Sequence, residues 1–153
     1  MSVRYFSRRH AMLSFGSKAN PVGAPRTVSV PPLEVDIAFD ADQGYLSVRT
    51  AGTIDGLSLP GLLTASAAAA QKHQCYRFFV DHRASGLRLN ATEIYNVPAS
   101  LERHGIVGHR AAVLFSKIGD DERFLELVCA NRGIFAKVFT HPNEALAWLL
   151  LEP

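Results

Sequence analysis

Two segments of alternating apolar and polar residues predict the start of the folded domain. Residues 35–39 (Val-Asp-Ile-Ala-Phe) and 45–50 (Tyr-Leu-Ser-Val-Arg-Thr) both show the period of two that is typical of a half-buried strand. Residues 40–44 between them contain two Asp and one Gly, which favour a turn. We therefore expect the two strands to form an antiparallel hairpin.

After residue 50 the hydrophobic pattern alternates between helix-like and strand-like segments. Apolar residues at helical spacing predict four helices, at about residues 59–73, 91–104, 121–132 and 142–150. Short, mainly apolar runs predict three further strands, at 76–80, 109–115 and 134–139. The resulting order, β-β-α-β-α-β-α-β-α, indicates a single α/β domain with a five-stranded mixed sheet, parallel after its first strand and joined by right-handed crossovers.

The local sequence marks where two of the helices begin or bend. Asn90-Ala91-Thr92-Glu93 has the spacing of a capping box, in which the Asn and Glu side chains each accept a backbone N–H. Pro98 lies inside the helix that follows and is expected to kink or split it. In the last helix, Trp148 lies close to Ala145 and Leu149, so we expect it in the core.

Residues 1–32 differ in composition from the rest of the chain. They contain five Arg or Lys residues, no acidic residue, and prolines at 21, 25, 31 and 32. Because prolines block regular structure, we expect a basic, Pro- and Ser-rich, flexible arm over 1–32, followed by one domain over 33–153. The Arg- and Ser-rich, acid-free start also fits a mitochondrial transit peptide, which is the alternative interpretation.

Charge and composition exclude several functional classes. The formal net charge is +2, but residues 33–153 carry 11 Lys or Arg against 14 Asp or Glu, which argues against nucleic acid as the main partner. No run reaches the roughly 18 apolar residues that a membrane span needs. Cys75 and Cys129 lie 54 residues apart without paired spacing and indicate buried thiols in a reducing compartment. The cytoplasm is the expected location.

This order of elements resembles that of STAS domains, the SpoIIAA-like family of anti-sigma-factor antagonists. Phe78-Phe79-Val80-Asp81 is similar to the family's apolar strand that ends in Asp, and residues 110–114 are similar to its fourth strand. Val138-Phe139 followed by residues 144–149 is similar to its closing segment, so the resemblance covers about residues 33–151. It implies a non-catalytic regulatory module that often binds a protein partner.

The resemblance also implies where a regulatory switch would lie. In family members that work as phosphoswitches, a Ser opens the helix after the third strand, within an Asp-Ser-Ser-Gly-Leu-like stretch. Here that helix opens with residues 90–93, and Ser85-Gly86-Leu87 lies earlier, so the chain departs from the motif. Thr92 and Ser85 are the candidate phospho-acceptors. The fold family also resembles the CRAL-TRIO carriers of apolar ligands, which gives the alternative function: a carrier or sensor of a small apolar or lipid-like molecule.

The candidate binding residues follow the third strand. Ligands of open α/β sheets bind beyond the carboxyl ends of the parallel strands. The segment 81–93 lies there and is expected to contain a long loop of ten residues, from Arg83 to Thr92. In this interpretation Asp81 caps nearby loop N–H groups and His82 is a loop residue at the strand end.

Two forms of binding site are open to this segment. A protein partner requires an exposed, partly apolar surface, which we expect around Leu87, Leu89, Ile94 and Tyr95. A small ligand requires an apolar pocket of roughly 300 Å³ or more beneath the second helix. The predicted partner- or ligand-binding residues are Asp81, His82, Arg83, Leu87, Arg88, Asn90, Ile94 and Tyr95.

The sequence offers few residues for catalysis. Asp81, His82 and Ser85 are neighbours in sequence, whereas a catalytic triad brings its members together from separate elements. The chain has no HExxH motif, paired Cys/His spacing or phosphate-binding Gly motif. We expect no enzyme activity, cofactor or metal site. The expected partner is a protein or a small apolar ligand, without nucleic acid or stable membrane insertion, and a homodimer is one option for assembly.

Overall fold

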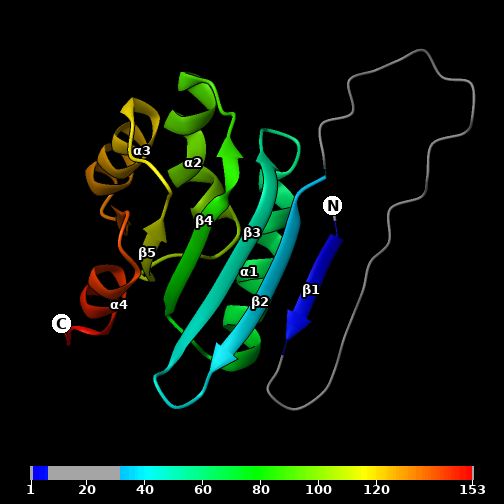
Figure 1. Cartoon of the computed structure of the whole chain (residues 1–153), viewed down its shortest axis with the longest axis vertical. Coiled ribbons are helices and arrows are strands. Elements are labelled where there is room, and N and C mark those ends of the chain that lie inside the picture. Colours follow the sequence, from blue (N-terminus) through cyan, green and yellow to red (C-terminus); the bar gives the residue numbers. More distant parts are fainter. Residues whose placement is uncertain (1, 7–31, 153) are drawn as a thin grey trace, which may run out of the picture.

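The computed structural model describes residues 2–6 and 32–152, which form one sheet covered by helices (Figure 1). The strands are β1 Ser2–Phe6, β2 Glu34–Asp40, β3 Tyr45–Ile54, β4 Arg77–Leu87, β5 Arg110–Leu114 and β6 Phe135–Phe139. The helices are α1 Leu59–His73, α2 Ala91–Arg103, α3 Asp120–Asn131 and α4 Pro142–Leu150. The strands lie in the sheet in the same order as in the chain.

The predicted hairpin and the parallel strands after it are confirmed. β2 and β3 pair antiparallel and end with Asp40 opposite Tyr45. The Asp40 carboxylate closes their turn, because it accepts the backbone N–H groups of Asp42 and Gln43 at 3.1 and 3.0 Å. β4, β5 and β6 then follow one after another, each parallel to the strand before it.

The sheet has six strands, so the predicted number of five is wrong. The additional strand, β1, comes from the N-terminal arm and pairs in parallel with β2, with Ser2 opposite Glu34. Its Val3 is buried in the main core cluster. A five-residue segment gives too short a pattern to predict such pairing, because the partner strand lies far away in the sequence. Residues 1 and 7–31 of the predicted arm lie outside the described residues.

The sheet separates two apolar layers, because successive side chains of a strand point to opposite faces. On β4, Phe78 packs with α1 in the larger core cluster, and Figure 1 shows α1 behind β2 and β3. The next residue, Phe79, packs on the other face with Trp148 of α4. A third cluster joins α2 to α3 through Ile94 and Val128. The sheet thus packs against α1 on one face and against α4 on the other.

Pro98 and the two cysteines are buried within this arrangement. α2 runs as one helix from Ala91 to Arg103, so the predicted split at Pro98 is not observed. The proline is a fully buried side chain, and its burial offsets the backbone hydrogen bond that it cannot make. Cys75 and Cys129 are free and buried, which confirms their prediction as buried thiols.

Gly52 in β3 occupies a position where a side chain does not fit. Its φ is +115°, and a Cβ there would lie 2.9 Å from the carbonyl oxygen of Pro32. We predict that Gly52→Ala lowers the free energy of unfolding by about 2 kcal/mol, because the methyl group strains both φ and this backbone contact. Gly86→Ala in neighbouring β4 is the matched control, since a Cβ at Gly86 would meet no atom within 4 Å. Urea unfolding of both variants measures the difference, and equal losses would contradict the prediction.

Candidate functional site

β4 extends well beyond the strand that the sequence predicts. The chain stays extended as far as Leu87 and pairs with β3 up to Ile54. Only residues 88–90 connect β4 to α2, so the predicted ten-residue loop is wrong. The reason is that β3 is itself ten residues long and supplies backbone partners along its whole length. The local sequence Arg-Ala-Ser-Gly-Leu at 83–87 contains no sign of this distant pairing.

A β-bulge in β4 sets the direction of the side chains in this extension. The pairing register shifts between Arg49 and Ala51, so that two β4 residues, His82 and Arg83, lie opposite Thr50 alone. An additional residue of this kind re-aims the side chains around it. His82 is consequently buried, whereas Arg83 is exposed.

Thr50, His82 and Ser85 form a hydrogen-bonded group at the bulge, which we call the Thr50 cluster. The Thr50 hydroxyl oxygen lies 2.6 Å from Nδ1 of His82 and 2.6 Å from the Ser85 hydroxyl oxygen. Thr50 is 4% and His82 8% exposed, and the imidazole packs on the Phe115 ring with 5.4 Å between the centroids. Burial lowers the pKa of His82 to about 4, so the imidazole is neutral at pH 7.

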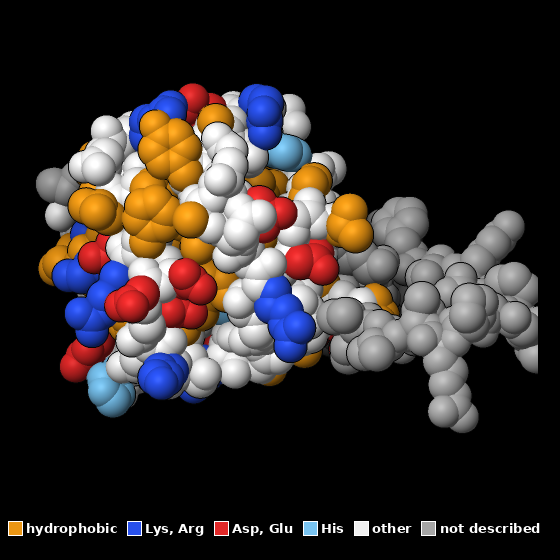
Figure 2. All heavy atoms as spheres, turned by 90° about the horizontal axis from the view of Figure 1, so that it is seen from above, with side chains coloured by type: hydrophobic (Ala, Val, Ile, Leu, Met, Phe, Trp, Pro, Cys, Tyr) orange, Lys and Arg blue, Asp and Glu red, His pale blue; other side chains and the backbone are white. Residues whose placement is uncertain are grey.

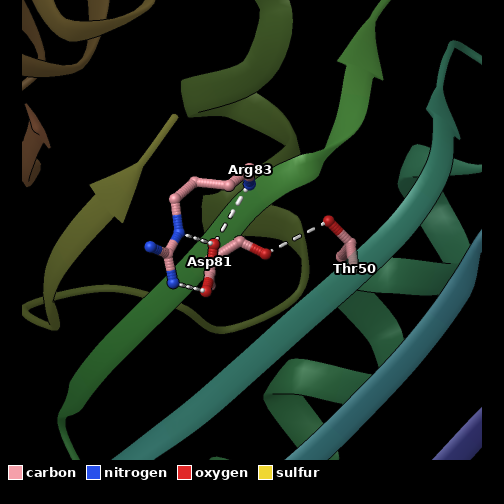
Figure 3. A network of polar contacts seen from close by, with 3 residues as sticks. All are labelled: Thr50, Asp81 and Arg83. Atoms are coloured by element: carbon pink, nitrogen blue, oxygen red, sulfur yellow. Dashed lines mark hydrogen bonds and ion pairs between the residues drawn. The ribbon is translucent and has the colours of Figure 1, made fainter. Parts of the chain in front are cut away.

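The Asp81 carboxylate is hydrogen-bonded and ion-paired to Arg83. The Arg83 guanidinium donates from Nε and Nη2 to the two carboxylate oxygens at 3.0 and 2.8 Å (Figure 3). The Arg83 backbone N–H donates to the same carboxylate at 3.1 Å. The Arg83 side chain thereby holds the pKa of Asp81 below its usual value. The Asp81 carboxylate therefore does not orient the imidazole as the acidic member of a catalytic triad would.

The first turn of α2 is capped and packed against the loop before α1. Asn90 Oδ1 accepts the Glu93 N–H at 2.9 Å and Glu93 Oε2 accepts the Asn90 N–H at 2.8 Å, which confirms the predicted capping box. Thr92, inside this turn, is exposed. The loop 55–58 lies against the same turn, since a Cβ at Gly56 would collide with the Glu93 carboxylate.

Leu57 projects from this loop into solvent. Asp55 Oδ1 accepts the N–H groups of Leu57 and Ser58 at 3.0 and 2.9 Å, and the Ser58 hydroxyl accepts the Asp55 N–H at 2.9 Å. The hydrogen bonds from the Ser58 and Leu57 N–H groups hold the pKa of the Asp55 carboxyl below its usual value. Leu57 is 93% exposed in spite of this ordered backbone. The sequence does not indicate this exposed side chain, because Asp-Gly-Leu-Ser at 55–58 has the composition of an ordinary turn.

The structure divides the predicted binding residues into exposed and buried ones. The exposed ones are Arg83, Arg88, Asn90, Thr92 and Tyr95, and the partly buried ones are Asp81, Ser85 and Leu87. His82, Leu89 and Ile94 are 8%, 6% and 0% exposed. The predicted exposure of Leu89 and Ile94 is therefore wrong, as is the placement of His82 in a loop. The cause is that the end of β4 and the turn after it direct Leu89 inward, where it packs with Ile94 between α2 and α3.

The exposed residues belong to the end of β4, the turn after it and the start of α2. This carboxyl edge of the sheet is at the top of Figure 1, and Figure 2 shows it from above. Hydrophobic side chains gather on the side of this face that α2 and α3 occupy, with acidic and basic side chains around them (Figure 2). We define the carboxyl-edge surface as Leu57, Arg88, Thr92 and Tyr95. Tyr95 is 56% exposed, so Leu57 and Tyr95 both contribute a large, mainly apolar side chain to the carboxyl-edge surface.

An apolar cavity of about 130 Å³ lies beneath this edge, between the sheet and helices α1, α2 and α3. Its walls are side chains from all three helices and from β3 to β6, with His82 among them. Cys129 of α3 also lines it, and burial raises the pKa of this thiol to about 11, so it is not a nucleophile at neutral pH. The volume is below the roughly 300 Å³ expected for a carrier of lipid-like ligands.

Two further features of the described residues bear on function. Over 2–6 and 32–152, no three His, Cys, Asp or Glu side chains come together as metal ligands. In the same part of the chain, no helix combines the length and the apolar character that crossing a bilayer requires.

Comparison with solved structures identifies the fold. The chain matches, with a TM-score of 0.56, the crystal structure of an uncharacterised DUF3478 family protein with a SpoIIAA-like fold from Shewanella loihica PV-4. The two sequences are 16% identical, and the match covers 82% of this chain and 99% of that one. The fold is SpoIIAA-like. The fold that the STAS resemblance implies is thereby confirmed.

Similarity is lower to two structures of SpoIIAA. The unphosphorylated anti-sigma factor antagonist SpoIIAA has a TM-score of 0.48 and 10% identity, over 74% of this chain and 96% of that one. The phosphorylated Bacillus cell fate determinant SpoIIAA has a TM-score of 0.44 and 13% identity, over 74% and 97%. No protein-family profile matches the sequence, and no curated protein matches it. The likeness is thus one of SpoIIAA-like fold, and the site residues must be argued from this chain itself.

Proposed function

We propose that this protein is a non-catalytic regulatory module that binds a protein partner through its carboxyl-edge surface. The observation that carries the proposal is the 93% exposure of Leu57 on a loop whose backbone is fixed by Asp55 and Ser58. A large apolar side chain that an ordered loop holds in water gains almost no burial on folding. It contributes to stability only when a partner removes it from water.

The neighbouring residues suit a protein partner. Tyr95 and Arg88 are of the side-chain types that are enriched at protein interfaces, and both are exposed. The Arg88 backbone is anchored, because its N–H donates to the Ile54 carbonyl at 2.8 Å, so the guanidinium extends from a fixed point. A partner that offers an apolar pocket for Leu57 and an acidic group for Arg88 would complement this surface.

The same surface contains the better of the two candidate phospho-acceptors. Thr92 is exposed in the first turn of α2, where a phosphate group would meet the positive end of the helix dipole. Ser85 is less suited, since it is partly buried and its hydroxyl lies 2.6 Å from that of Thr50. Phosphorylation of Thr92 would add charge directly to the partner surface, which makes it the proposed point of regulation.

The arrangement of the titratable groups supports a role without catalysis. The Asp81 carboxylate is occupied by Arg83, and the His82 imidazole is enclosed with its Nδ1 on Thr50. Ser85 contacts the Thr50 hydroxyl rather than a ring nitrogen, so it lacks the base that activates a nucleophilic Ser.

Capture of partners from lysate of the native cell tests the proposal. We expect Leu57→Ser, Tyr95→Ser and Arg88→Ala each to reduce recovery of a specific partner by about tenfold or more, as for residues at an interface centre. Val107→Ser is the matched control: Val107 is 62% exposed but lies between α2 and β5, at the opposite end of the sheet. Unchanged recovery with all three variants, or equal loss with Val107→Ser, would rule out the carboxyl-edge surface.

Thr92→Glu in the same experiment tests the regulatory part. The negative charge lies near a helix N-terminus, so it should leave the domain folded, with a thermal midpoint close to that of the parent. Partner recovery should change, whereas Thr92→Gln, which has a similar size without the charge, should behave as the parent. Identical recovery with Glu and Gln would show that charge at Thr92 has no regulatory effect.

A further inference from the structure

The apolar cavity beneath the carboxyl edge is larger than an ordinary packing defect. Protein cores seldom leave voids much larger than one water molecule. This cavity measures about 130 Å³, which is roughly ten times the space that one water molecule needs. Apolar cavities of about this size stay dry and take up small aromatic molecules. The cavity therefore has room for a single ring.

His82 is an incompletely hydrogen-bonded polar group in the wall of this cavity. Its Nδ1 is engaged by Thr50 at 2.6 Å, and its Nε2 makes no hydrogen bond to another described residue. The side chain is only 8% exposed, so little of the ring reaches bulk water. The other acidic or basic side chain in the wall, Glu126, is held by the Val138 N–H at 2.7 Å. Polar atoms inside native proteins nearly always have a partner. A molecule in the cavity that forms a hydrogen bond with Nε2 would complete the pairing of the His82 ring.

We propose that the cavity binds a compact, uncharged, mostly apolar molecule with one hydroxyl group, of the class of small phenols, whose hydroxyl is hydrogen-bonded to His82. The proposal is independent of the partner surface, because it rests on the cavity and on His82, and neither belongs to that surface.

A hydroxyl group satisfies His82 in either tautomer. If Nδ1 accepts the Thr50 proton, Nε2–H donates to the ligand oxygen. If Nδ1 donates to Thr50, Nε2 accepts the ligand proton, and a hydroxyl can serve in both cases. A carboxylate ligand is disfavoured, because burial lowers the pKa of His82 to about 4 and leaves no positive charge to meet it. The Glu126 carboxyl in the same wall disfavours an anion further.

A bound hydroxyl would extend an existing chain of hydrogen bonds to the outside of the domain. From His82 the chain runs through the Thr50 hydroxyl to Ser85, which is partly exposed on β4. Occupancy of the cavity would thus fix the proton positions in the Thr50 cluster. The ring of the ligand would fill the space that Phe115 and the aliphatic side chains leave open beside His82.

Phenol and toluene are suitable probes, because they have similar size and differ in the hydroxyl group. We expect phenol to bind the parent at one saturable site in ligand-detected NMR and to shift the imidazole proton signals of His82. His82→Leu should weaken phenol binding by about tenfold, the effect of one hydrogen bond, and leave toluene binding nearly unchanged. Ala111→Leu, which fills the cavity from β5, should abolish saturable binding of both.

Three outcomes would overturn the proposal: no saturable phenol binding to the parent, equal phenol affinity of the parent and His82→Leu, or full phenol binding by Ala111→Leu. Circular dichroism checks that each variant is folded. If Ala111→Leu does not fold, Ala136→Val is a smaller cavity-filling change from β6 with the same expected result. The partner capture experiment uses other residues, so either proposal can fail without the other.

Discussion

Replacing Trp148 with Ala is expected to lower the free energy of unfolding by about 3 kcal/mol. Trp148 packs at the sheet face covered by α4, where its ring lies 5.7 Å from that of Phe139. The Arg110 guanidinium lies 4.2 Å from the ring centroid, and Arg110 Nε is buried without a hydrogen-bond partner. Removing the indole would thus cost apolar burial, a cation–π contact and the cover over the buried Nε of Arg110.

The matched variant is Trp148→Phe, which keeps an aromatic ring over Arg110 and should lose less than half as much stability. Urea unfolding followed by circular dichroism measures both changes. The sequence predicts Trp148 as a core residue, and the structure places it partly buried at the margin of the α4 cluster, so the expected loss is at the lower end for a large aromatic. An alanine variant as stable as the parent would show that α4 does not depend on this contact.

Lowering the pH from 7.5 to 5 is expected to remove about 2 kcal/mol of stability through His82 alone, and about 3 kcal/mol by pH 4. Burial lowers the pKa of His82 from 6.5 to about 4 in the folded protein. Between these two pH values the unfolded chain therefore binds a proton at His82 and the folded chain does not. The contribution of His82 is therefore fully present above about pH 6.5 and is lost as the pH falls toward 4.

The control is His82→Gln, whose amide can hydrogen-bond to Thr50 but does not titrate. Urea unfolding of parent and variant between pH 7.5 and 4 gives the free energy of unfolding of each as a function of pH. The difference between the two curves is the contribution of His82. The comparison is needed because burial also lowers the pKa values of His73 and His109, and the lowered pKa values of Asp55 and Asp81 add losses at still lower pH. Parallel pH profiles would mean that His82 is accessible to water in the folded protein.

The sequence predicts where the site lies in the fold but not which residues form it. Its place at the carboxyl edge follows from the order of strands and helices, and the cap formed by Asn90 and Glu93 follows from their spacing. Thr50 was missed because it appears as one more polar residue in an alternating strand. Thr50 becomes the centre of the Thr50 cluster only when the bulge brings His82 and Ser85 to its hydroxyl.

The sequence by itself determined what depends on near neighbours: the hairpin closed by Asp40, the spacing of the helices and the capping of α2. Those features follow from hydrogen bonds and hydrophobic periodicity within a few residues. Only the tertiary structure decided that β1 joins the sheet, that β4 continues to Leu87, and that Ile94 is buried while Leu57 is exposed. Strand pairing and exposure depend on backbone groups and packing surfaces that meet from distant parts of the chain, and no local pattern encodes which ones will meet.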